Sequence, residues 1–352
     1  MIINGVGIKS RPRPALLRSS IFDLPSSIFN CYRPPVNFLV TGGAGFIGSH
    51  VCERLLNLGH SVWAFDDLNP FYDPQLKRRN LRDIQSLAKP FEFIHGDITD
   101  RPALDEVFAS VKFDQVIHLA ARAGVRPSLA EPALYQRVNV EGTVNLLEAA
   151  RLSGVKKIII ASSSSVYGVN SKVPFAESDP IFAAISPYAA SKLACEALGH
   201  VYHHVYGMDV AMLRFFTVYG PRQRPDLAIH KFAKLINAGQ PIPVFGDGST
   251  ARDYTYVTDT VDGVIACTGK EIGFDIFNLG ESQTVTLSYL IELIEKALGK
   301  KAIIDRQPPQ PGDVPVTFAD ITKSRARLGY QPHIKVEQGI TLFIDWLRRN
   351  HA

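Results

Sequence analysis

The 352-residue sequence predicts an α/β protein in which a doubly wound parallel sheet is followed by a smaller C-terminal α/β lobe. Short apolar segments, typical of buried strands, alternate with amphipathic helical segments from Val36 to about Arg214. A glycine-rich turn directly follows the first apolar segment, as in parallel sheets that bind phosphate at the start of a helix. Beyond Arg214 the elements become shorter and prolines interrupt them, which indicates a second lobe over the carboxyl ends of the strands.

The elements of the sheet can be assigned in order along the chain. Segments rich in β-branched and aromatic residues are predicted as strands: residues 37–41, 61–66, 91–95, 115–120 and 157–162. Helices are predicted between them. The first covers 46–58 and ends at Gly59, whereas the second strand is followed by a polar stretch to about Asn80. In the second lobe, 289–298 is predicted as a helix and 307–315 as a proline-rich loop.

The net charge of the chain is concentrated near its N-terminus. Residues 1–36 hold five basic residues and the single acidic residue Asp23, which together equal the net charge of +4 of the whole chain. Because the other residues sum to zero, we expect no nucleic-acid-binding face on the folded part. The segment lacks the long apolar stretch of a secretory signal, so we expect a basic, disordered tail, with a transit peptide as the open alternative.

Apolar content and cysteine spacing narrow the class of protein further. No apolar run reaches the ~18 residues that would span a membrane. The apolar share of 46% and the charged share of 20% are typical of a globular protein. The cysteines are Cys31, Cys52, Cys195 and Cys267, and their spacing matches neither a metal site nor a disulfide scaffold. We therefore expect free thiols, no metal and a cytoplasmic location.

The glycine-rich turn predicts a dinucleotide site. Gly42, Gly45 and Gly48 allow a tight turn and a close approach of the backbone to a pyrophosphate. Asp66 ends the second strand, where a carboxylate accepts hydrogen bonds from the adenine ribose hydroxyls and repels a 2′-phosphate. This Rossmann pattern favours NAD over NADP as the cofactor.

Other strand ends supply the rest of the predicted cofactor pocket. Asp97 and Ile98 follow the third strand, where the adenine could rest, and small residues after the fourth strand leave room for the cofactor. His118, which ends the fourth strand, is interpreted as a packed histidine rather than a catalyst. Further residues assigned to the cofactor are Phe46, Ile47, Leu119, Ala120, Ala121 and Phe216.

Tyr188 and Lys192 are the candidates for acid–base chemistry. They lie four residues apart on one helix face, so the ammonium group can favour ionisation of a phenol whose usual pKa is about 10. The end of the fifth strand, Ser162–Ser165, offers hydroxyls that could polarise a substrate oxygen. Beside a nicotinamide site, this set predicts hydride chemistry on an alcohol.

With these motifs the chain resembles the extended short-chain dehydrogenases/reductases, in the group of NAD-dependent nucleotide-sugar epimerases and dehydratases. The resemblance runs from about Asn37 to the C-terminus. It implies that Tyr188 is the acid/base and that Lys192 is its partner and binds the nicotinamide ribose. It also implies that Ser163 is the catalytic hydroxyl and that Asn139, in Asn-Val-Glu-Gly-Thr, belongs to the cofactor site.

The same resemblance implies a domain organisation and an assembly. Residues 37–213 are expected to form the NAD-binding Rossmann domain, to which segments near 254–280 return. Residues 214–352 are expected to form mainly the nucleotide-sugar-binding lobe. A homodimer through the Tyr188 helix is what the family implies.

The serine-rich segment distinguishes between the reactions of this group. The 4,6-dehydratases carry an Asp-Glu pair just before a Val-Tyr-Gly segment, because eliminating water needs a dedicated acid and base. The UDP-glucuronate decarboxylases carry a Glu there. Because Ser164 and Ser165 stand at these positions, the resemblance favours an epimerase.

Three further segments are similar to UDP-glucuronate 4-epimerases in particular. Thr217, in Phe-Phe-Thr-Val-Tyr-Gly-Pro, stands where UDP-galactose 4-epimerases have Asn. Residues 66–77 and the segment Ala-Gly-Val-Arg that ends at Arg126 are also similar.

The resemblance implies contacts to both ends of a UDP-sugar. Hydroxyls of Ser164, Ser165 and Thr217 could hold a C6 carboxylate, to which Arg224 or Lys231 could add charge unless they are surface residues. In this family the segment with Val244 and Phe245 borders the uracil, and a guanidinium contacts the diphosphate. The residues assigned to the nucleotide are Val244, Phe245, Arg252 and Asp313, and Arg126 is assigned to the substrate as well.

The sequence thus predicts a UDP-glucuronate 4-epimerase that forms UDP-galacturonate through a 4-keto sugar with bound NAD. Three alternatives stay open: a 4-epimerase for UDP-glucose or UDP-N-acetylglucosamine, a net dehydrogenase or reductase, and a non-catalytic NAD-binding regulator.

Overall fold

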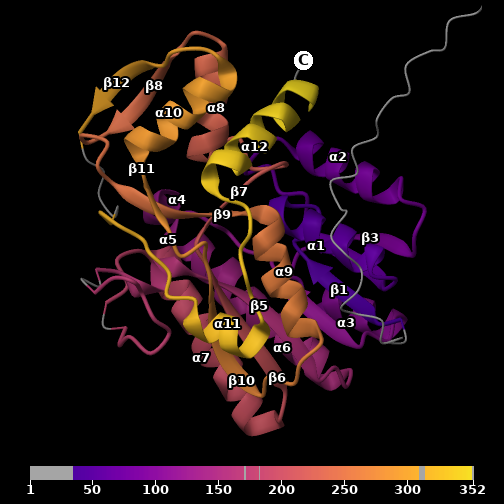
Figure 1. Cartoon of the computed structure of the whole chain (residues 1–352). Helices are drawn as coiled ribbons and strands as arrows, with labels where there is room; N and C mark the ends of the chain where they lie inside the picture. The colour runs from indigo at the N-terminus through magenta and orange to yellow at the C-terminus, as the bar shows by residue number, and fades with distance from the viewer. Residues whose placement is uncertain (1–34, 170–171, 182, 309–313, 351–352) are drawn as a thin grey trace, which may run out of the picture. The chain divides into compact units, whose positions relative to one another are not determined.

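The structure, a computed structural model, describes residues 35–169, 172–181, 183–308 and 314–350. Its centre is a seven-stranded sheet with the order β10-β6-β5-β4-β1-β2-β3, in which every paired strand runs parallel (Figure 1). The strands are β1 (Asn37–Thr41), β2 (Ser61–Asp66), β3 (Phe91–His95), β4 (Gln115–His118), β5 (Lys157–Ser163), β6 (Asp209–Phe215) and β10 (Phe274–Leu279). The predicted doubly wound parallel sheet is confirmed, and its switch point lies between β1 and β4.

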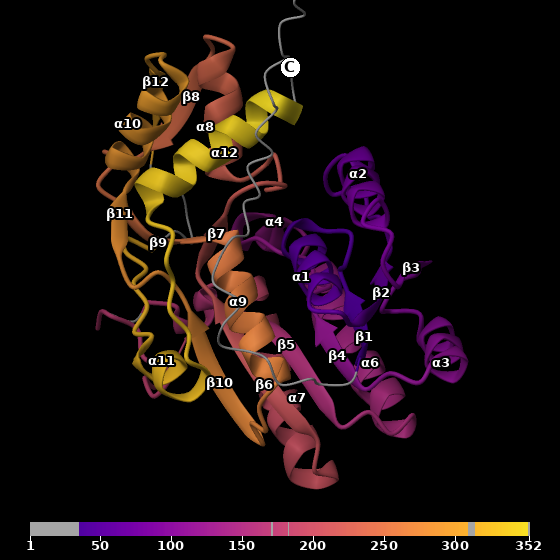
Figure 2. The same cartoon turned by 45° about the vertical axis from the view of Figure 1, so that its right-hand side comes forward.

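Helices cover both faces of this sheet because alternate residues of each strand point to opposite sides. In β1, Phe38 and Val40 belong to one hydrophobic cluster and Leu39 to another. The first cluster includes residues of α1 and α9, which lie side by side in Figure 2. The second includes residues of α3, α6 and α7. The helices of the sheet are α1 (Phe46–Asn57), α2 (Pro74–Gln85), α3 (Arg101–Ser110), α6 (Gly142–Leu152), α7 (Pro187–Tyr206) and α9 (Val257–Thr268).

Short turns connect these elements near the strand ends. Two short helices and a π-helical turn lead from β4 to α6, and a 3-10 turn follows β5. They are α4 (Val125–Ala130), α5 (Pro132–Tyr135), η2 (Gln136–Glu141) and η3 (Ser164–Tyr167).

The C-terminal part of the chain adds two small sheets, with the strand orders β11-β9-β7 and β12-β8. Their strands are β7 (Thr217–Tyr219), β8 (Pro241–Phe245), β9 (Ala251–Tyr256), β11 (Thr284–Thr286) and β12 (Ile303–Gln307). The helices of this part are α8 (Ala228–Asn237), α10 (Leu287–Leu298), α11 (Thr322–Leu328) and α12 (Val336–Asn350). Because β10 pairs with β6, the chain returns to the central sheet after β9 and α9. The division into two domains stays a prediction.

Helix α2 differs from the polar stretch expected after the second strand. Asp73 caps its start by accepting a hydrogen bond from the backbone N–H of Gln75 at 2.9 Å, and Pro74 occupies the first turn. The buried face of α2 includes two polar residues, Lys77 and Asn80, beside Leu81 and Ile84. These polar residues interrupt the apolar periodicity that predicts a helix from sequence, so the helix was not predicted.

Other boundaries differ by a residue or two. Strand β4 ends at His118, before the predicted residue 120, and β5 extends one residue further, to Ser163. In the described part of the chain, no helix combines the length and the apolarity needed to cross a membrane.

Candidate active site at the carboxyl ends of the sheet

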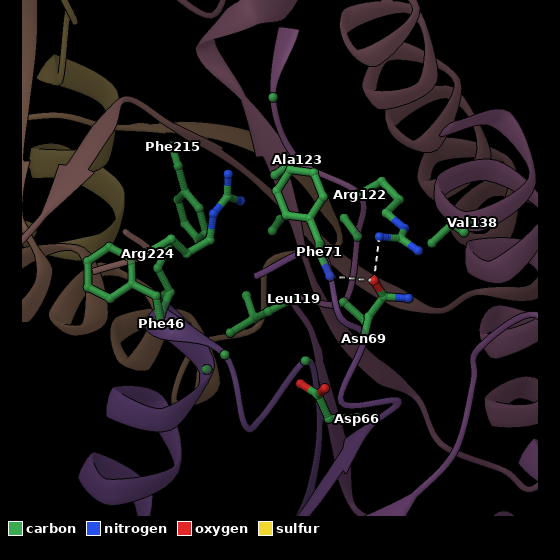
Figure 3. A pocket seen from close by; sticks show the side chains of 18 of the residues that line it. Phe46, Asp66, Asn69, Phe71, Leu119, Arg122, Ala123, Val138, Phe215 and Arg224 are labelled. Atoms are coloured by element: carbon green, nitrogen blue, oxygen red, sulfur yellow. Dashed lines mark hydrogen bonds between the residues drawn. The ribbon is translucent and has the colours of Figure 1, made fainter. Parts of the chain in front are cut away.

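A cavity of about 370 Å³ lies at the carboxyl ends of the central strands (Figure 3). One side is lined by the turns after β1, β2, β3 and β4, and the other by residues 215–227. Many residues predicted from the sequence line it: Gly42, Gly45, Phe46, Ile47, Gly48, Asp66, Asp97, Ile98, Leu119, Ala120, Ala121, Ser163, Tyr188, Lys192, Phe216, Thr217 and Arg224. The fold thus brings together segments more than 150 residues apart.

The glycine turn leaves no room for larger residues. Gly42 has a φ of +69°, and a Cβ atom there would lie 2.7 Å from the backbone nitrogen of Ala120. A Cβ atom at Gly48 would lie 2.1 Å from the carbonyl oxygen of Gly42. The turn is held by two hydrogen bonds, from Gly42 N–H to the Phe65 carbonyl at 2.8 Å and from Gly45 N–H to the Gly42 carbonyl at 3.0 Å. These contacts let α1 begin directly against the cavity.

The start of α1 suits an anion. Gly45 is the N-cap residue of α1, and no side chain caps the helix. The first N–H groups of α1 therefore face the cavity without a side-chain acceptor. A helix N-terminus after a glycine turn is a common binding site for a pyrophosphate.

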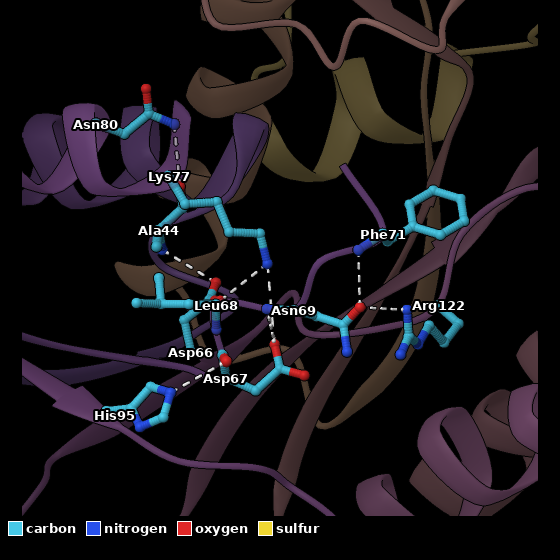
Figure 4. Close-up of polar contacts among 10 residues, drawn as sticks. All are labelled: Ala44, Asp66, Asp67, Leu68, Asn69, Phe71, Lys77, Asn80, His95 and Arg122. Atoms are coloured by element: carbon cyan, nitrogen blue, oxygen red, sulfur yellow. Dashed lines mark hydrogen bonds and ion pairs between the residues drawn. The ribbon is translucent and has the colours of Figure 1, made fainter. Parts of the chain in front are cut away.

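Asp66 is buried at the end of β2, at the other side of this turn (Figure 4). Its Oδ1 accepts hydrogen bonds from Leu68 N–H at 2.9 Å and from Lys77 Nζ at 3.1 Å. Its Oδ2 accepts one from Ala44 N–H at 3.2 Å. A carboxylate has about four acceptor sites, so Asp66 retains capacity for a ribose hydroxyl.

Lys77 is a residue of this site that the sequence interpretation did not assign. It is 7% exposed, lines the cavity and forms an ion pair with Asp66, and its ammonium group lies 5.4 Å from the centre of the Tyr72 ring. Lys77 lies on the buried face of α2, three residues before Asn80. A lysine on a buried face needs an acceptor or a carboxylate as its partner, so this position was a signal in the sequence. Asn80 donates to the carbonyl of Ala44, which joins α2 to the glycine turn at 3.0 Å.

Tyr188 and Lys192 stand on the first turns of α7, beside the end of β5. The Ser186 hydroxyl caps this helix by accepting from Ala189 N–H at 3.1 Å. Lys192 Nζ donates to the carbonyl of Ala161 at 2.8 Å, so the ammonium group is tied to the last residues of β5. The Tyr188 ring packs edge to face with the Tyr135 ring at 6.2 Å. This arrangement fixes a phenol and an ammonium group at the same cavity wall.

Residues 162–167, which we name the serine turn, lie beside this wall, and the first two of them line the cavity. Ser163 caps η3, because its hydroxyl oxygen accepts from Ser165 N–H at 3.1 Å. Its hydroxyl also lies 3.1 Å from that of Ser165. Ser164 and Ser165 are half-buried beside Ser163 but are not among the residues that line the cavity. Ser162 also lines the cavity, and its hydroxyl donates to Glu196 Oε1 at 2.6 Å.

The sugar-binding candidates on the opposite wall include a half-buried cation. Arg224 forms a bidentate ion pair with Asp226, at 3.0 Å and 2.7 Å, and its guanidinium lies 5.1 Å from the centre of the Phe71 ring. Desolvation would lower the pKa of Arg224, but hydrogen bonding to Asp226 raises it overall. Thr217 is half-buried in the same wall. This wall of the cavity therefore combines a neutral hydroxyl with an arginine.

Other predicted residues lie behind the cavity or beyond its lining. Asn139 is buried one layer behind it, where it donates to Ser191 Oγ at 2.9 Å and accepts from Arg122 N–H at 2.7 Å. His118 lies between the hydroxyls of Thr41 and Thr143, at 2.7 Å and 3.0 Å. Burial, with a smaller effect of the charge of Lys192, lowers the pKa of His118 to about 3, so it is neutral and packed.

The predicted nucleotide residues lie further out. The guanidinium of Arg126, on α4, lies 4.7 Å from the centre of the Phe245 ring. These two substrate-binding candidates are distant in sequence but contact each other in the fold. Val244 is buried, and Arg252 donates to the carbonyls of Ala251 and Pro315 at 2.9 Å and 3.3 Å. Lys231 is exposed on α8 and does not line the cavity, and Asp313 lies outside the described residues.

The loop after β2 holds cavity residues that sequence reasoning missed. Asn69 Oδ1 accepts hydrogen bonds from the Arg122 guanidinium at 2.6 Å and from Phe71 N–H at 3.0 Å (Figure 4). All three residues line the cavity. The close similarity of residues 66–77 to one enzyme group was the only signal, because a loop carries no periodic pattern.

Comparison with known proteins agrees with this site. The family model described as GDP-mannose 4,6 dehydratase matches residues 39–343. The UDP-glucuronate 4-epimerase of Thermodesulfobacterium geofontis is 44% identical over 89% of this chain and 96% of its own length. UDP-glucuronate 4-epimerase 5 of Arabidopsis thaliana is 43% identical over 88% of this chain and 74% of its own length.

Two solved structures extend the comparison to bound ligands. The UDP-glucuronic acid 4-epimerase of Bacillus cereus, in complex with UDP-glucuronic acid and NAD, matches with a TM-score of 0.83 and 36% identity over 89% of this chain and 99% of its own. The UDP-glucose 4-epimerase of Thermotoga maritima, with UDP-glucose, matches with a TM-score of 0.83 and 34% identity over 90% of this chain and 100% of its own.

Proposed function

The chain belongs to the family of nucleotide-sugar-modifying enzymes described as GDP-mannose 4,6 dehydratase, and from that premise we propose that it is a UDP-glucuronate 4-epimerase. It is an NAD-dependent enzyme that interconverts UDP-glucuronate and UDP-galacturonate through a 4-keto sugar. The observation that carries this assignment is the sugar end of the cavity, where Ser163, Thr217 and Arg224 stand and the serine turn has no carboxylate.

The residues at the glycine turn fit NAD. A Cβ atom at Gly42 or Gly48 would clash with the backbone, so only glycine fits this turn. The uncapped start of α1 can bind the pyrophosphate. Asp66 has acceptor capacity for the adenine ribose. When bound, NAD supplies a reversible acceptor for the hydrogen on C4 of the sugar.

The chain's own residues handle the proton of the C4 hydroxyl. Tyr188 takes this proton as the C4 carbonyl forms and returns it when the carbonyl is reduced from the other face. The Ala161 carbonyl fixes the ammonium group of Lys192 on the same face of α7 as Tyr188. The Ser163 hydroxyl donates to the C4 oxygen. Since every change is reversed within one cycle, the reaction has no net redox change.

The 4-keto sugar poses a second problem, because it is a β-keto acid. It loses carbon dioxide when the bond to C6 aligns with the C4 carbonyl π system. Hydroxyl contacts from Thr217, which lines the cavity, and from Ser164 and Ser165, which lie beside its lining, would with Arg224 hold the carboxylate away from this alignment. Because Asp226 forms an ion pair with Arg224, the guanidinium in the pocket is charge-compensated and is not a free cation.

The nucleotide and assembly assignments belong to the same proposal. Phe245 and Val244 border the uracil, Arg126 stacks on Phe245, and Arg252 contacts the diphosphate. A homodimer forms through α7, whose Val201, Val205 and Tyr206 are exposed. A cytoplasmic location suits the free, buried thiols of the described cysteines Cys52, Cys195 and Cys267.

The test is to incubate the protein with UDP-glucuronate and, separately, with UDP-glucose, and to resolve the products by NMR. UDP-galacturonate without a decarboxylated pentose is expected. Faster formation of UDP-galactose would instead identify a UDP-glucose 4-epimerase, for which the similarity to the Thermotoga enzyme is the favouring observation. Stoichiometric reduction of added NAD would identify a net dehydrogenase.

A further inference from the structure

A buried ion pair lies directly behind the serine turn. Glu196 of α7 accepts hydrogen bonds from Arg214 of β6 at both carboxylate oxygens, each at 2.8 Å. Glu196 is 6% exposed and Arg214 is 2% exposed. Neither residue lines the cavity, and the reaction described above does not use them.

This pair contacts the serine turn at both of its ends. Ser162, which begins the turn, donates to Glu196 Oε1 at 2.6 Å. Tyr167, which ends it, lies under the Arg214 guanidinium, with 4.7 Å from the guanidinium carbon to the ring centre. Tyr167 is held in turn by its hydroxyl, which donates to Asn278 Oδ1 of β10 at 2.7 Å. The candidate hydroxyls of the turn thus stand between two residues anchored to one ion pair.

The same pair is also linked to the catalytic helix. Glu196 lies on α7 one turn after Lys192 and two turns after Tyr188. Arg214 is the register partner of Ser162 in the β5–β6 pairing. Glu196 therefore links the serine turn to the helix that carries Tyr188 and Lys192, beside the direct bond from Lys192 to the Ala161 carbonyl.

Stability alone does not explain a buried ion pair at this place. Apolar residues of similar volume often give equal stability, because desolvating two charges offsets their attraction. Directional bonds, by contrast, hold their neighbours in one geometry. An error of about 1 Å in such a geometry can slow catalysis about a hundredfold.

We propose that Glu196 and Arg214 are positioning residues that hold the serine turn against Tyr188 and Lys192, and so limit the loss of carbon dioxide from the keto sugar. This inference rests on the proposed function. In the side reaction the C5–C6 bond breaks, carbon dioxide leaves, and the electron pair passes into the C4 carbonyl as an enolate. Protonation at C5 then gives UDP-4-keto-pentose, and the cofactor stays reduced because the pentose leaves before reduction.

The chain offers a matched control pair on the same two strands. Lys157 and Asp209 are register partners at the opposite ends of β5 and β6, and their side chains form a partly buried ion pair at 2.6 Å. Asp209 also accepts from Ile272 N–H and Gly273 N–H, each at 3.0 Å, so asparagine is the replacement that keeps an acceptor.

The test compares the double variant Glu196→Met/Arg214→Met with the control Lys157→Met/Asp209→Asn, using the full chain with bound NAD and UDP-glucuronate. The first variant should fold and retain NAD, with kcat lowered about tenfold or more and a severalfold larger share of decarboxylated pentose. The control should keep the wild-type product ratio whatever its melting temperature. Glu196→Gln, which keeps the shape of the side chain, should change the ratio in the same direction by less.

Two failures are distinguishable in this experiment. If the wild-type protein forms no UDP-galacturonate, the proposed function fails. If the wild type epimerises and Glu196→Gln and the folded double variant both keep its kcat and product ratio, the positioning role is overturned. An equal rise of the pentose in the control variant would also overturn it, because the effect would then follow from lost stability.

Discussion

The two ends of the cavity are built in different ways. The cofactor end consists of turns that directly follow β1, β2, β3 and β4, and hydrogen bonds join the first of these turns to the end of β2. The sugar end is assembled from the serine turn and residues 215–227, which lie at and beyond the ends of β5 and β6. The cofactor end is therefore suited to a common ligand of the family, whereas the sugar end can change with the substrate.

Tyr188 stands where the two ends meet, so its loss should have the largest effect and should not depend on the sugar. Tyr188→Phe removes the hydroxyl that carries the proton, and we expect kcat to fall about a thousandfold or more with every UDP-sugar that binds. The measurement is the initial rate of epimerisation with NAD content determined in parallel. Tyr135→Phe is the control, because Tyr135 packs against Tyr188 and donates only to the Ala123 carbonyl. Equal losses in both variants would contradict the role of Tyr188.

A change at the cofactor end should affect all substrates alike. In Gly48→Ala the new Cβ atom would lie 2.1 Å from the Gly42 carbonyl oxygen, so the turn must shift. Such overpacking costs about 1–3 kcal/mol, and we expect NAD affinity to fall about tenfold to a hundredfold. The affinity is measured by titrating NAD into the apoprotein. Gly45→Ala, with 3.1 Å to the same oxygen, should lose less, and the opposite order would contradict this geometry.

A change at the sugar end should separate the substrates. Thr217→Val keeps the shape of the side chain and removes its hydroxyl, which leaves a carboxylate without one of its hydrogen bonds. Bonds to charged groups contribute about 1.5–3 kcal/mol, so kcat/KM for UDP-glucuronate should fall about tenfold or more. The value for UDP-glucose should change little, and Thr217→Ser should restore the activity with UDP-glucuronate. Parallel losses for both sugars would show that Thr217 does not recognise the carboxylate.

His118 should affect stability and neither ligand. Its pKa falls from the ordinary 6.5 to about 3, first through burial and second through the charge of Lys192. Below pH 6.5 the imidazole is therefore protonated in the unfolded chain but stays neutral in the folded protein. This group's full contribution to the free energy of unfolding is present above that pH and is lost as the pH falls towards 3. Between pH 6.5 and 4 this amounts to about 3 kcal/mol.

Urea unfolding at a series of pH values checks this effect. The slope of the free energy of unfolding against pH should correspond to the uptake of one proton fewer on unfolding in His118→Gln than in the wild type. His50, whose pKa burial and Arg222 also lower to about 3, keeps its own share in both proteins. Parallel curves for the two proteins would contradict the buried, neutral state of His118.

The comparison of the two ends also explains what the sequence could and could not predict. The central sheet, Gly42, Gly48 and Asp66 followed from local patterns, because a glycine turn and a strand end are read within a few residues. Lys77 was missed because α2 interrupts its apolar stripe with polar side chains that find partners only in the fold. Glu196 and Arg214 were missed because nothing in one sequence marks which strand a helix side chain will face.

The proposed mechanism requires that the hydrogen removed from C4 stays in the site and returns to the same carbon. UDP-glucuronate carrying deuterium at C4 tests it directly, with the UDP-galacturonate product analysed by NMR and mass spectrometry. We expect the product to retain the deuterium at C4 in ordinary water. Exchange of the label with solvent, or its accumulation in released cofactor, would contradict the account.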